Sequence, residues 1–337
     1  MVPPAVPRPA RRSSPRPDPA ELLAAADLPS RESPSGRPLG RPLYVETECK
    51  SALNRVRNMP FKWSLNPYTG CHHNCTFCFA RQFYATADRG DPDADFQSLI
   101  YVKTNFPRIL RRELGRPSWK ADLVALGTAT DPYQPAEGRY RLTRGVLEAL
   151  LEHRTPLNML TKSPLVQRDA ELLGQLSREV EVTVMFSITT MDLDLWKQVE
   201  PGTAQPIHRL RALRALRRAG VKAGVFMAPV LPGLTDTVDR IGELAAAARA
   251  HDASFFTAIP LRLMPTVKEH YLAFIDRDFP ELADRYQRAY PGTNAPKAYR
   301  EKLGERVQRI RRAYGFERAS QRVVLGRQPP GRQMRLP

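Results

Sequence analysis

The chain has 337 residues with a hydrophobic content of 42%, enough for one large domain with tails or two small domains. It has no apolar stretch of bilayer-spanning length and no apolar region after the N-terminal arginines, so we expect a cytoplasmic protein with no membrane partner. The formal net charge is +17, and three of the four cysteines fall within eight residues, which favours metal binding over a disulfide framework.

Residues 1–42 hold eleven of the 32 prolines and almost no aromatic residues, so we predict a disordered tail there. From residue 43 onward, apolar strand patterns alternate with helical patterns. With a further strand just before Cys71, this order predicts an α/β fold over residues 43–290, a partial (β/α)6 TIM-like barrel whose chemistry gathers at the carboxyl ends of its strands. The predicted strands are 121–127, 157–161, 180–188, 221–228 and 254–261, and the predicted helices are 142–153, 169–176, 207–219 and 235–250.

The remaining residues, 291–337, are expected to form a basic extension, helical or loose. From Lys297 to the end there are twelve Lys and Arg against three Glu, and the run 208–222 has six Lys and Arg and no acid. Such segments can attract nucleic acid through phosphate contacts, or they can be plain solvated surface. Nucleic acid is therefore a candidate partner of the basic C-terminal region.

The clustered cysteines Cys71, Cys75 and Cys78 follow the spacing Cys-x₃-Cys-x₂-Cys, and Gly70 permits the turn into their loop. Three thiolates this close can hold three corners of a [4Fe–4S] cluster and leave one iron open. An open iron can chelate the amino and carboxylate groups of S-adenosylmethionine. One electron then breaks a carbon–sulfur bond of that cofactor and gives a 5′-deoxyadenosyl radical.

A zinc site is the alternative interpretation, with His72 or His73 as the fourth ligand. Zinc usually takes pairs of ligands from two separated segments, and no second Cys or His pair follows downstream. The two histidines also lie inside the tight loop, where it is difficult for an imidazole to reach the metal ion that the thiolates bind.

The string from Met59 to Cys71, together with the aromatic Phe77 before the last cysteine, carries a resemblance to a known family. It resembles the radical S-adenosylmethionine superfamily, and within it the spore photoproduct lyase-like or DNA repair photolyase-like proteins of an uncharacterised actinobacterial branch. The likeness covers roughly residues 43–282.

The resemblance implies that four residues help to hold S-adenosylmethionine: Phe77, Thr128, Lys162 and Ser187. Thr128 lies in the loop after the strand 121–127, where many relatives bind the cofactor's amino group. Lys162 closes the next strand and can pair with a carboxylate, although most lysines are simply solvated. Ser187 ends the following strand and is either a cofactor contact or a satisfied buried serine.

One departure from the family bears on the reaction. Spore photoproduct lyase carries a further cysteine near the end of the second strand, which returns hydrogen to the product radical. Here residues 127–130 contain no cysteine, and none follows Cys78. A direct copy of that chemistry is therefore not expected, and no catalytic residue is assigned. Tyr84 and Tyr133 could donate hydrogen, while Cys49 is more typical of a buried inert thiol.

Three functions follow from these observations. The first is a radical enzyme with a [4Fe–4S] cluster and S-adenosylmethionine, acting on an unknown substrate and served by a reductant protein such as flavodoxin or ferredoxin. The second is a narrower version of it, a DNA-lesion lyase whose basic helix and tail grip phosphates. The third is a non-catalytic, metal-stabilised nucleic-acid-binding protein.

Overall fold

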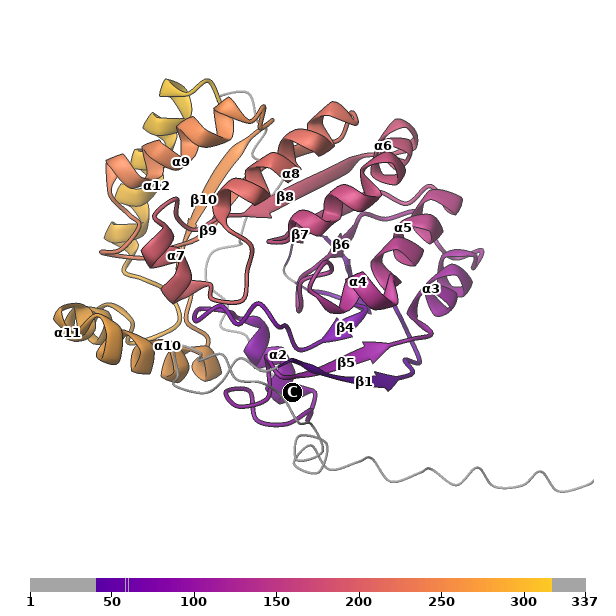
Figure 1. Cartoon of the computed structure of the whole chain (residues 1–337), viewed down its shortest axis with the longest axis horizontal. Coiled ribbons are helices and arrows are strands. Elements are labelled where there is room, and N and C mark those ends of the chain that lie inside the picture. Colours follow the sequence, from indigo (N-terminus) through magenta and orange to yellow (C-terminus); the bar gives the residue numbers. More distant parts are fainter. Residues whose placement is uncertain (1–40, 58, 60, 317–337) are drawn as a thin grey trace, which may run out of the picture.

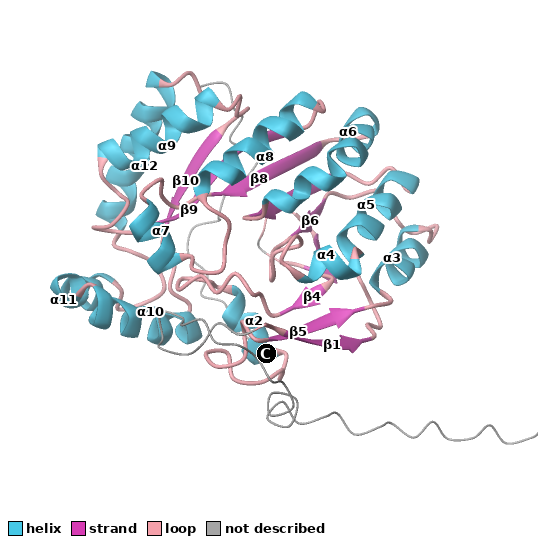
Figure 2. Cartoon of the chain, in the orientation of Figure 1, coloured by secondary structure: helices cyan, strands magenta, loops and turns pink. Residues whose placement is uncertain are grey.

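The computed structural model describes residues 41–57, 59 and 61–316 (Figures 1 and 2). The predicted disorder of the N-terminal tail thus falls outside the described residues, apart from its last two positions, and so do residues 317–337 of the basic extension. Within the described part of the chain, no helix is long and apolar enough to cross a membrane.

The largest sheet has seven strands in the order β10-β9-β8-β7-β6-β3-β2. Six of them run parallel, and the short β2 pairs antiparallel with β3 at one edge. The order ends at β10 and β2, so the sheet is open, which confirms the partial barrel predicted from the sequence. The strands are β2 Asn54–Arg55, β3 Trp63–Leu65, β6 Val124–Leu126, β7 Leu157–Thr161, β8 Val182–Ser187, β9 Lys222–Val230 and β10 Phe256–Pro260.

Helices that follow the strands form an arc around the sheet (Figure 1). Their apolar stripes supply the main core; in α5, for example, Val146, Leu147 and Leu150 are fully buried. Every helix predicted between strands is confirmed to within a few residues at its ends. These connecting elements are α3 Phe106–Leu114, α4 Ala136–Tyr140, α5 Leu142–Glu152, η1 Pro164–Asp169, α6 Ala170–Glu179, α7 Leu193–Val199, α8 Pro206–Arg218 and α9 Val238–Ala250.

A second, three-stranded sheet in the order β1-β5-β4 carries the cysteine loop. Its strands are β1 Leu43–Thr47, β4 Tyr68–Thr69 and β5 Leu99–Lys103, and the loop after β4 leads into α2 Ala80–Thr86. Gly70 opens this loop with φ of +83°, and a Cβ there would lie 2.8 Å from the carbonyl oxygen of Leu99. The turn therefore requires glycine.

Three helices follow β10: α10 Pro265–Asp278, α11 Pro280–Ala289 and α12 Lys297–Ala313. α10 packs against α2, and α12 packs against α9 and β10. Leu303, Val307 and Ile310 of α12 are buried in the main core. The first part of the basic extension is thus built into the domain.

Candidate active site

The cysteine loop lies across the carboxyl ends of the parallel strands, between the small sheet and the end of α7. Cys71 and Cys75 are buried and Cys78 is half-buried. The backbone N–H of Cys71 donates to the Phe96 carbonyl at 2.9 Å, and the N–H of Thr76 donates to the Val199 carbonyl at 3.0 Å. The loop is therefore held from two sides by segments distant in sequence.

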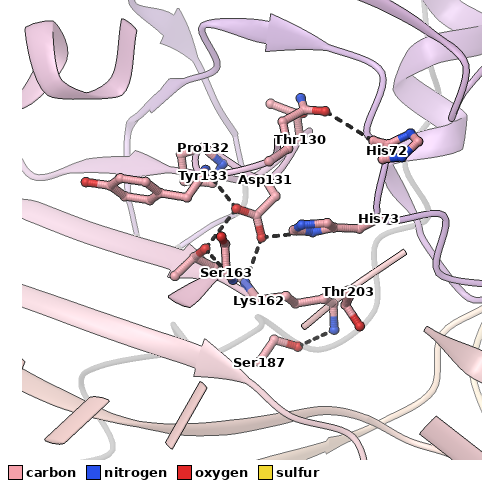
Figure 3. A network of polar contacts seen from close by, with 12 residues as sticks. His72, His73, Thr130, Asp131, Pro132, Tyr133, Lys162, Ser163, Ser187 and Thr203 are labelled. Atoms are coloured by element: carbon pink, nitrogen blue, oxygen red, sulfur yellow. Dashed lines mark hydrogen bonds and ion pairs between the residues drawn. The ribbon is translucent and has the colours of Figure 1, made fainter. Parts of the chain in front are cut away.

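The loop after β6 holds the start of the cysteine loop (Figure 3). The Thr130 hydroxyl donates to the Gly70 carbonyl at 2.7 Å, and the Gln134 amide donates to the same oxygen at 3.1 Å. In return, the backbone N–H of His72 donates to the Gln134 side-chain oxygen at 3.1 Å. These contacts fix where the first cysteine lies relative to the sheet.

Asp131 joins the cysteine loop to the end of β7. Its carboxylate accepts from the Thr161 hydroxyl at 2.8 Å and the Lys162 backbone N–H at 2.7 Å, and its Oδ2 lies 3.3 Å from His73 Nδ1. Burial alone would raise the pKa of Asp131 and lower that of His73. Their mutual attraction outweighs burial, so the pKa of Asp131 is lowered and that of His73 rises to about 10.

Three of the four residues expected at the cofactor lie together, contributed by the cysteine loop and by the ends of β7 and β8. Lys162 Nζ donates to the Ser187 hydroxyl at 2.7 Å and lies 5.3 Å from the centre of the Phe77 ring. The Lys162 side chain is 14% exposed, so it is not a solvated surface lysine. The structure brings these residues together, and their contact with S-adenosylmethionine stays a prediction.

Thr128 takes a separate position at the end of β6. Its hydroxyl accepts from the Asn66 side-chain amide at 3.2 Å, and Asn66 Oδ1 accepts from the Ala129 backbone N–H at 2.8 Å. Asn66, which follows β3, thereby fixes the loop that carries Thr128. The sequence reasoning did not single out Asn66.

Glu200, which lies just after α7 and is buried, was also not expected from the sequence. Its Oε1 accepts from Lys162 Nζ at 2.6 Å, and its Oε2 lies 2.6 Å from Nη1 of the buried Arg209. Burial opposes ionisation, but Arg209 and then Lys162 outweigh it and lower the pKa of Glu200 to about 2. Glu200 is therefore an anion that holds Lys162 in place, and it also forms an ion pair with Arg209.

The residues next to Glu200 hold the cysteine loop directly. The Gly202 N–H donates to the His73 carbonyl at 3.1 Å, and a Cβ on Gly202 would lie 2.3 Å from the His72 carbonyl oxygen. Val199 accepts the Thr76 N–H, as described above. The segment Val199–Thr203 thus fastens the cysteine loop and the lysine at the end of β7 to one another.

A further side chain absent from the sequence prediction is Arg81, in the first turn of α2. It is fully buried, and its Nη2 donates to Asn74 Oδ1 at 2.6 Å within the cysteine loop. The sequence signal was its position three residues after Cys78, but a basic residue on a helix is usually solvated.

The two candidate hydrogen donors do not face the lysine at the end of β7. The Tyr133 ring points away from Asp131 and His73 (Figure 3), and its hydroxyl donates to Asp169 Oδ2 at 3.0 Å. The Tyr84 hydroxyl donates to the Leu99 carbonyl at 3.4 Å inside the small sheet's core. Cys49 is half-buried and donates to Asn105 Oδ1 at 3.3 Å.

Comparisons with known proteins identify the family. The Radical SAM superfamily pattern matches residues 65–245. An uncharacterised protein of Mycobacterium tuberculosis is 42% identical over 268 residues, which are 78% of each chain. A radical SAM Nalpha-GlyT isomerase of Pseudomonas phage M6 is 26% identical over 184 residues, or 54% of this chain and 36% of that one.

The fold is also similar to solved structures of spore photoproduct lyase. One mutant, solved with bound AdoMet and dinucleoside spore photoproduct, has a TM-score of 0.59 and 17% identity, covering 81% of this chain and 80% of the other. At this identity the likeness shows the fold.

Proposed function

Because this chain belongs to the radical SAM superfamily, we propose that it is an enzyme that cleaves S-adenosylmethionine reductively at a [4Fe–4S] cluster bound by Cys71, Cys75 and Cys78. The 5′-deoxyadenosyl radical formed from the cofactor would abstract hydrogen from a substrate that is not yet identified. The superfamily implies the cofactor and an iron–sulfur cluster; the cluster type and the ligands are our proposal.

The donor set of the loop fits such a cluster. Among the described residues, no three Cys, His, Asp or Glu side chains converge as a single metal ion would require. A cubane cluster requires a wider spacing of its ligands, since each thiolate binds a different iron. The same loop lies against a buried donor, because Arg81 Nε has no hydrogen-bond partner among the described atoms. Buried N–H groups of this kind suit sulfide and thiolate acceptors.

The observation that carries the proposal is the grouping of Phe77, Lys162 and Ser187 beside that loop. An ammonium has three donors, and Lys162 uses two of them on Ser187 and Glu200. The third donor can bind the carboxylate of S-adenosylmethionine, while the Phe77 ring limits the access of water. Glu200 holds the lysine at this place through its ion pair, and Arg209 compensates the charge of Glu200 from the other side.

The test is anaerobic reconstitution with iron and sulfide, followed by reduction in the presence of S-adenosylmethionine. We expect a brown protein whose paramagnetic resonance spectrum changes when the cofactor is added, and which forms 5′-deoxyadenosine. The Cys75→Ala variant is the control. Equal yields from both proteins, or a colourless protein with stoichiometric zinc, would overturn the proposal and favour a structural metal site.

The second candidate is a DNA-lesion lyase, and the likeness to the spore photoproduct lyase fold favours it. The basic helix gives it less support than the sequence suggested. Arg209, near the start of α8, donates to the Ser187 carbonyl at the site, whereas the exposed Arg218 at its end lies about 13 Å further along the helix axis. A phosphate bound there would lie away from the cysteine loop.

DNA binding can be tested by measuring affinity against salt concentration. The variants Arg211→Ser and Arg218→Ser remove exposed charges on α8, and a chain ending at residue 316 removes the basic tail while keeping α12 in the core. A smaller salt slope in either one supports phosphate contacts at that place. A slope near zero in the full chain would remove the nucleic-acid candidate.

A further inference from the structure

Arg81 is a buried cation inside the cysteine loop's own core. Its side chain has no exposed surface, and its guanidinium lies 4.9 Å from the centre of the Phe96 ring. Nη2 donates to Asn74 Oδ1 at 2.6 Å and Nη1 donates to the Pro92 carbonyl at 2.5 Å. Both acceptors are neutral, so these bonds position the guanidinium without neutralising its charge.

The protein itself gives Arg81 little counter-charge. The carboxylate in reach is that of Asp93, at 3.8 Å from Nη1, and its side chain is 53% exposed. Arg81 Nε is buried and has no hydrogen-bond partner among the described residues. A buried guanidinium left in this state is strongly unfavourable, so its retention calls for a negatively charged neighbour.

The groups that surround the guanidinium are the cysteines. Phe96, on whose ring Arg81 lies, packs with Cys71 and Cys78 in one apolar cluster. The Arg81 backbone N–H donates to the Cys78 carbonyl at 3.3 Å, and Asn74, which accepts from Nη2, lies between Cys71 and Cys75 in the loop. Burial lowers the pKa of Arg81, and Cys78 heads the groups that oppose this.

We propose that Arg81 is a positioning residue that serves as the fixed counter-charge of the iron–sulfur cluster and raises its reduction potential. This inference rests on the cluster proposed above. A cluster held by three thiolates becomes more negative by one unit when it accepts one electron from a reductant. A guanidinium fixed nearby in a low-dielectric core favours that more negative state, and no proton has to move, because arginine stays charged.

A purely structural role gives a different expectation. If Arg81 only ties Asn74 to the Pro92 carbonyl, its removal should weaken the fold equally with and without the cluster. It should then leave the potential of any cluster that still assembles unchanged. The two roles are separated by measuring the potential and the effect of the cluster on thermal stability.

The experiment uses the full chain, reconstituted anaerobically, in five forms: the unsubstituted chain and four variants. Arg81→Met removes the charge, Arg81→Lys keeps it, and Asn74→Ala removes the hydrogen-bond acceptor while the charge stays. Arg89→Met is the matched control, since Arg89 stacks on Tyr101 just beyond the same helix. For each form, the midpoint potential is measured by a dithionite titration followed by paramagnetic resonance, and Tm is measured before and after reconstitution.

We expect Arg81→Met to shift the ratio of reduced to oxidised cluster at least tenfold toward oxidised. This corresponds to a fall of at least 59 mV in the midpoint potential of a one-electron couple. Arg81→Lys, Asn74→Ala and Arg89→Met should each keep the potential closer to the unsubstituted value. The rise in Tm on reconstitution should be smaller in Arg81→Met than in the other forms, even if its cluster is too scarce to titrate.

Two results would overturn the inference: an unchanged potential with an unchanged rise in Tm in Arg81→Met, or an equal displacement in Arg81→Lys and Arg81→Met. Failure of the unsubstituted chain to bind iron and sulfide would instead overturn the proposed function.

Discussion

Glu200 gives the sharpest prediction for the protein without its cofactors. In the Glu200→Gln variant, the Lys162 ammonium and the Arg209 guanidinium lose the anion that lies 2.6 Å from each. The ordinary pKa of 4.5 falls to about 2 in the folded chain. Since one pKa unit corresponds to about 1.4 kcal/mol, the ionised carboxylate stabilises the fold by about 3 kcal/mol.

The dependence on pH has a definite sign. Because the folded state lowers this pKa, the stabilisation is complete above pH 4.5 and is lost as the pH falls toward about 2. The free energy of unfolding of the Glu200→Gln variant lacks this part of the acid dependence. The difference between the two proteins should therefore be about 3 kcal/mol at pH 7 and smaller by about 2 kcal/mol at pH 3.

The assay is guanidinium chloride unfolding of the apo-protein at pH 7, 4 and 3. Glu148→Gln is the matched control, because Glu148 pairs with Arg111 and Arg144 on the surface and its side chain is 40% exposed. That variant should lose less than about 1 kcal/mol. Equal losses of unfolding free energy in both variants at pH 7, or a Glu200→Gln difference that stays constant down to pH 3, would show that the Glu200 charge does not stabilise the fold.

The remaining predictions concern the cofactor contacts and the loop packing. Lys162→Met should weaken S-adenosylmethionine binding to the reconstituted protein roughly 10- to 100-fold, since it removes a charged hydrogen bond; Lys62→Met, at a 71% exposed lysine, should not, and equal affinities by equilibrium dialysis would contradict this. Gly202→Ala should destabilise the apo-protein by about 1–3 kcal/mol and lower its bound iron, because its Cβ would strike the His72 carbonyl. Gly304→Ala, in open space on α12, should raise stability by about 0.5–1 kcal/mol; a loss there as large as that of Gly202→Ala, seen in Tm and iron content, would argue against steric contact as the cause.

Strands with a sustained apolar pattern could be predicted from the sequence, and short ones could not. The strand predicted at 157–161 is β7 with the same bounds, whereas the strand predicted at 121–127 is limited to residues 124–126. Ala121 takes φ of +51°, and the Asp122 carboxylate turns outward to pair with Lys62. The strand expected before Cys71 is present in the large sheet as β3, whereas β4, which directly precedes the cysteine loop, belongs to the small sheet. The small sheet was missed because β4 has two residues and the half-buried β1 is too mixed in polarity to show a period.

The candidate site was predictable where family resemblance or spacing marked a residue, as with the three cysteines and Lys162. Glu200 carries no such mark, and Arg81 carries only its spacing of three residues from Cys78. Glu200 pairs with Lys162, 38 residues away in sequence, and α2, which carries Arg81, packs against α10. The local sequence of a helix end gives no sign that a charge will be enclosed there. Burial of a charge is decided by tertiary packing, which a single sequence does not display.

The short segment 199–203 contacts both the cysteine loop and the lysine at the end of β7. It accepts the Thr76 N–H, donates to the His73 carbonyl and carries the anion that steadies Lys162. The cysteine loop and the lysine expected to bind the cofactor are therefore held by neighbouring atoms of a single turn. A substitution in this turn is therefore expected to disturb the cysteine loop and Lys162 together.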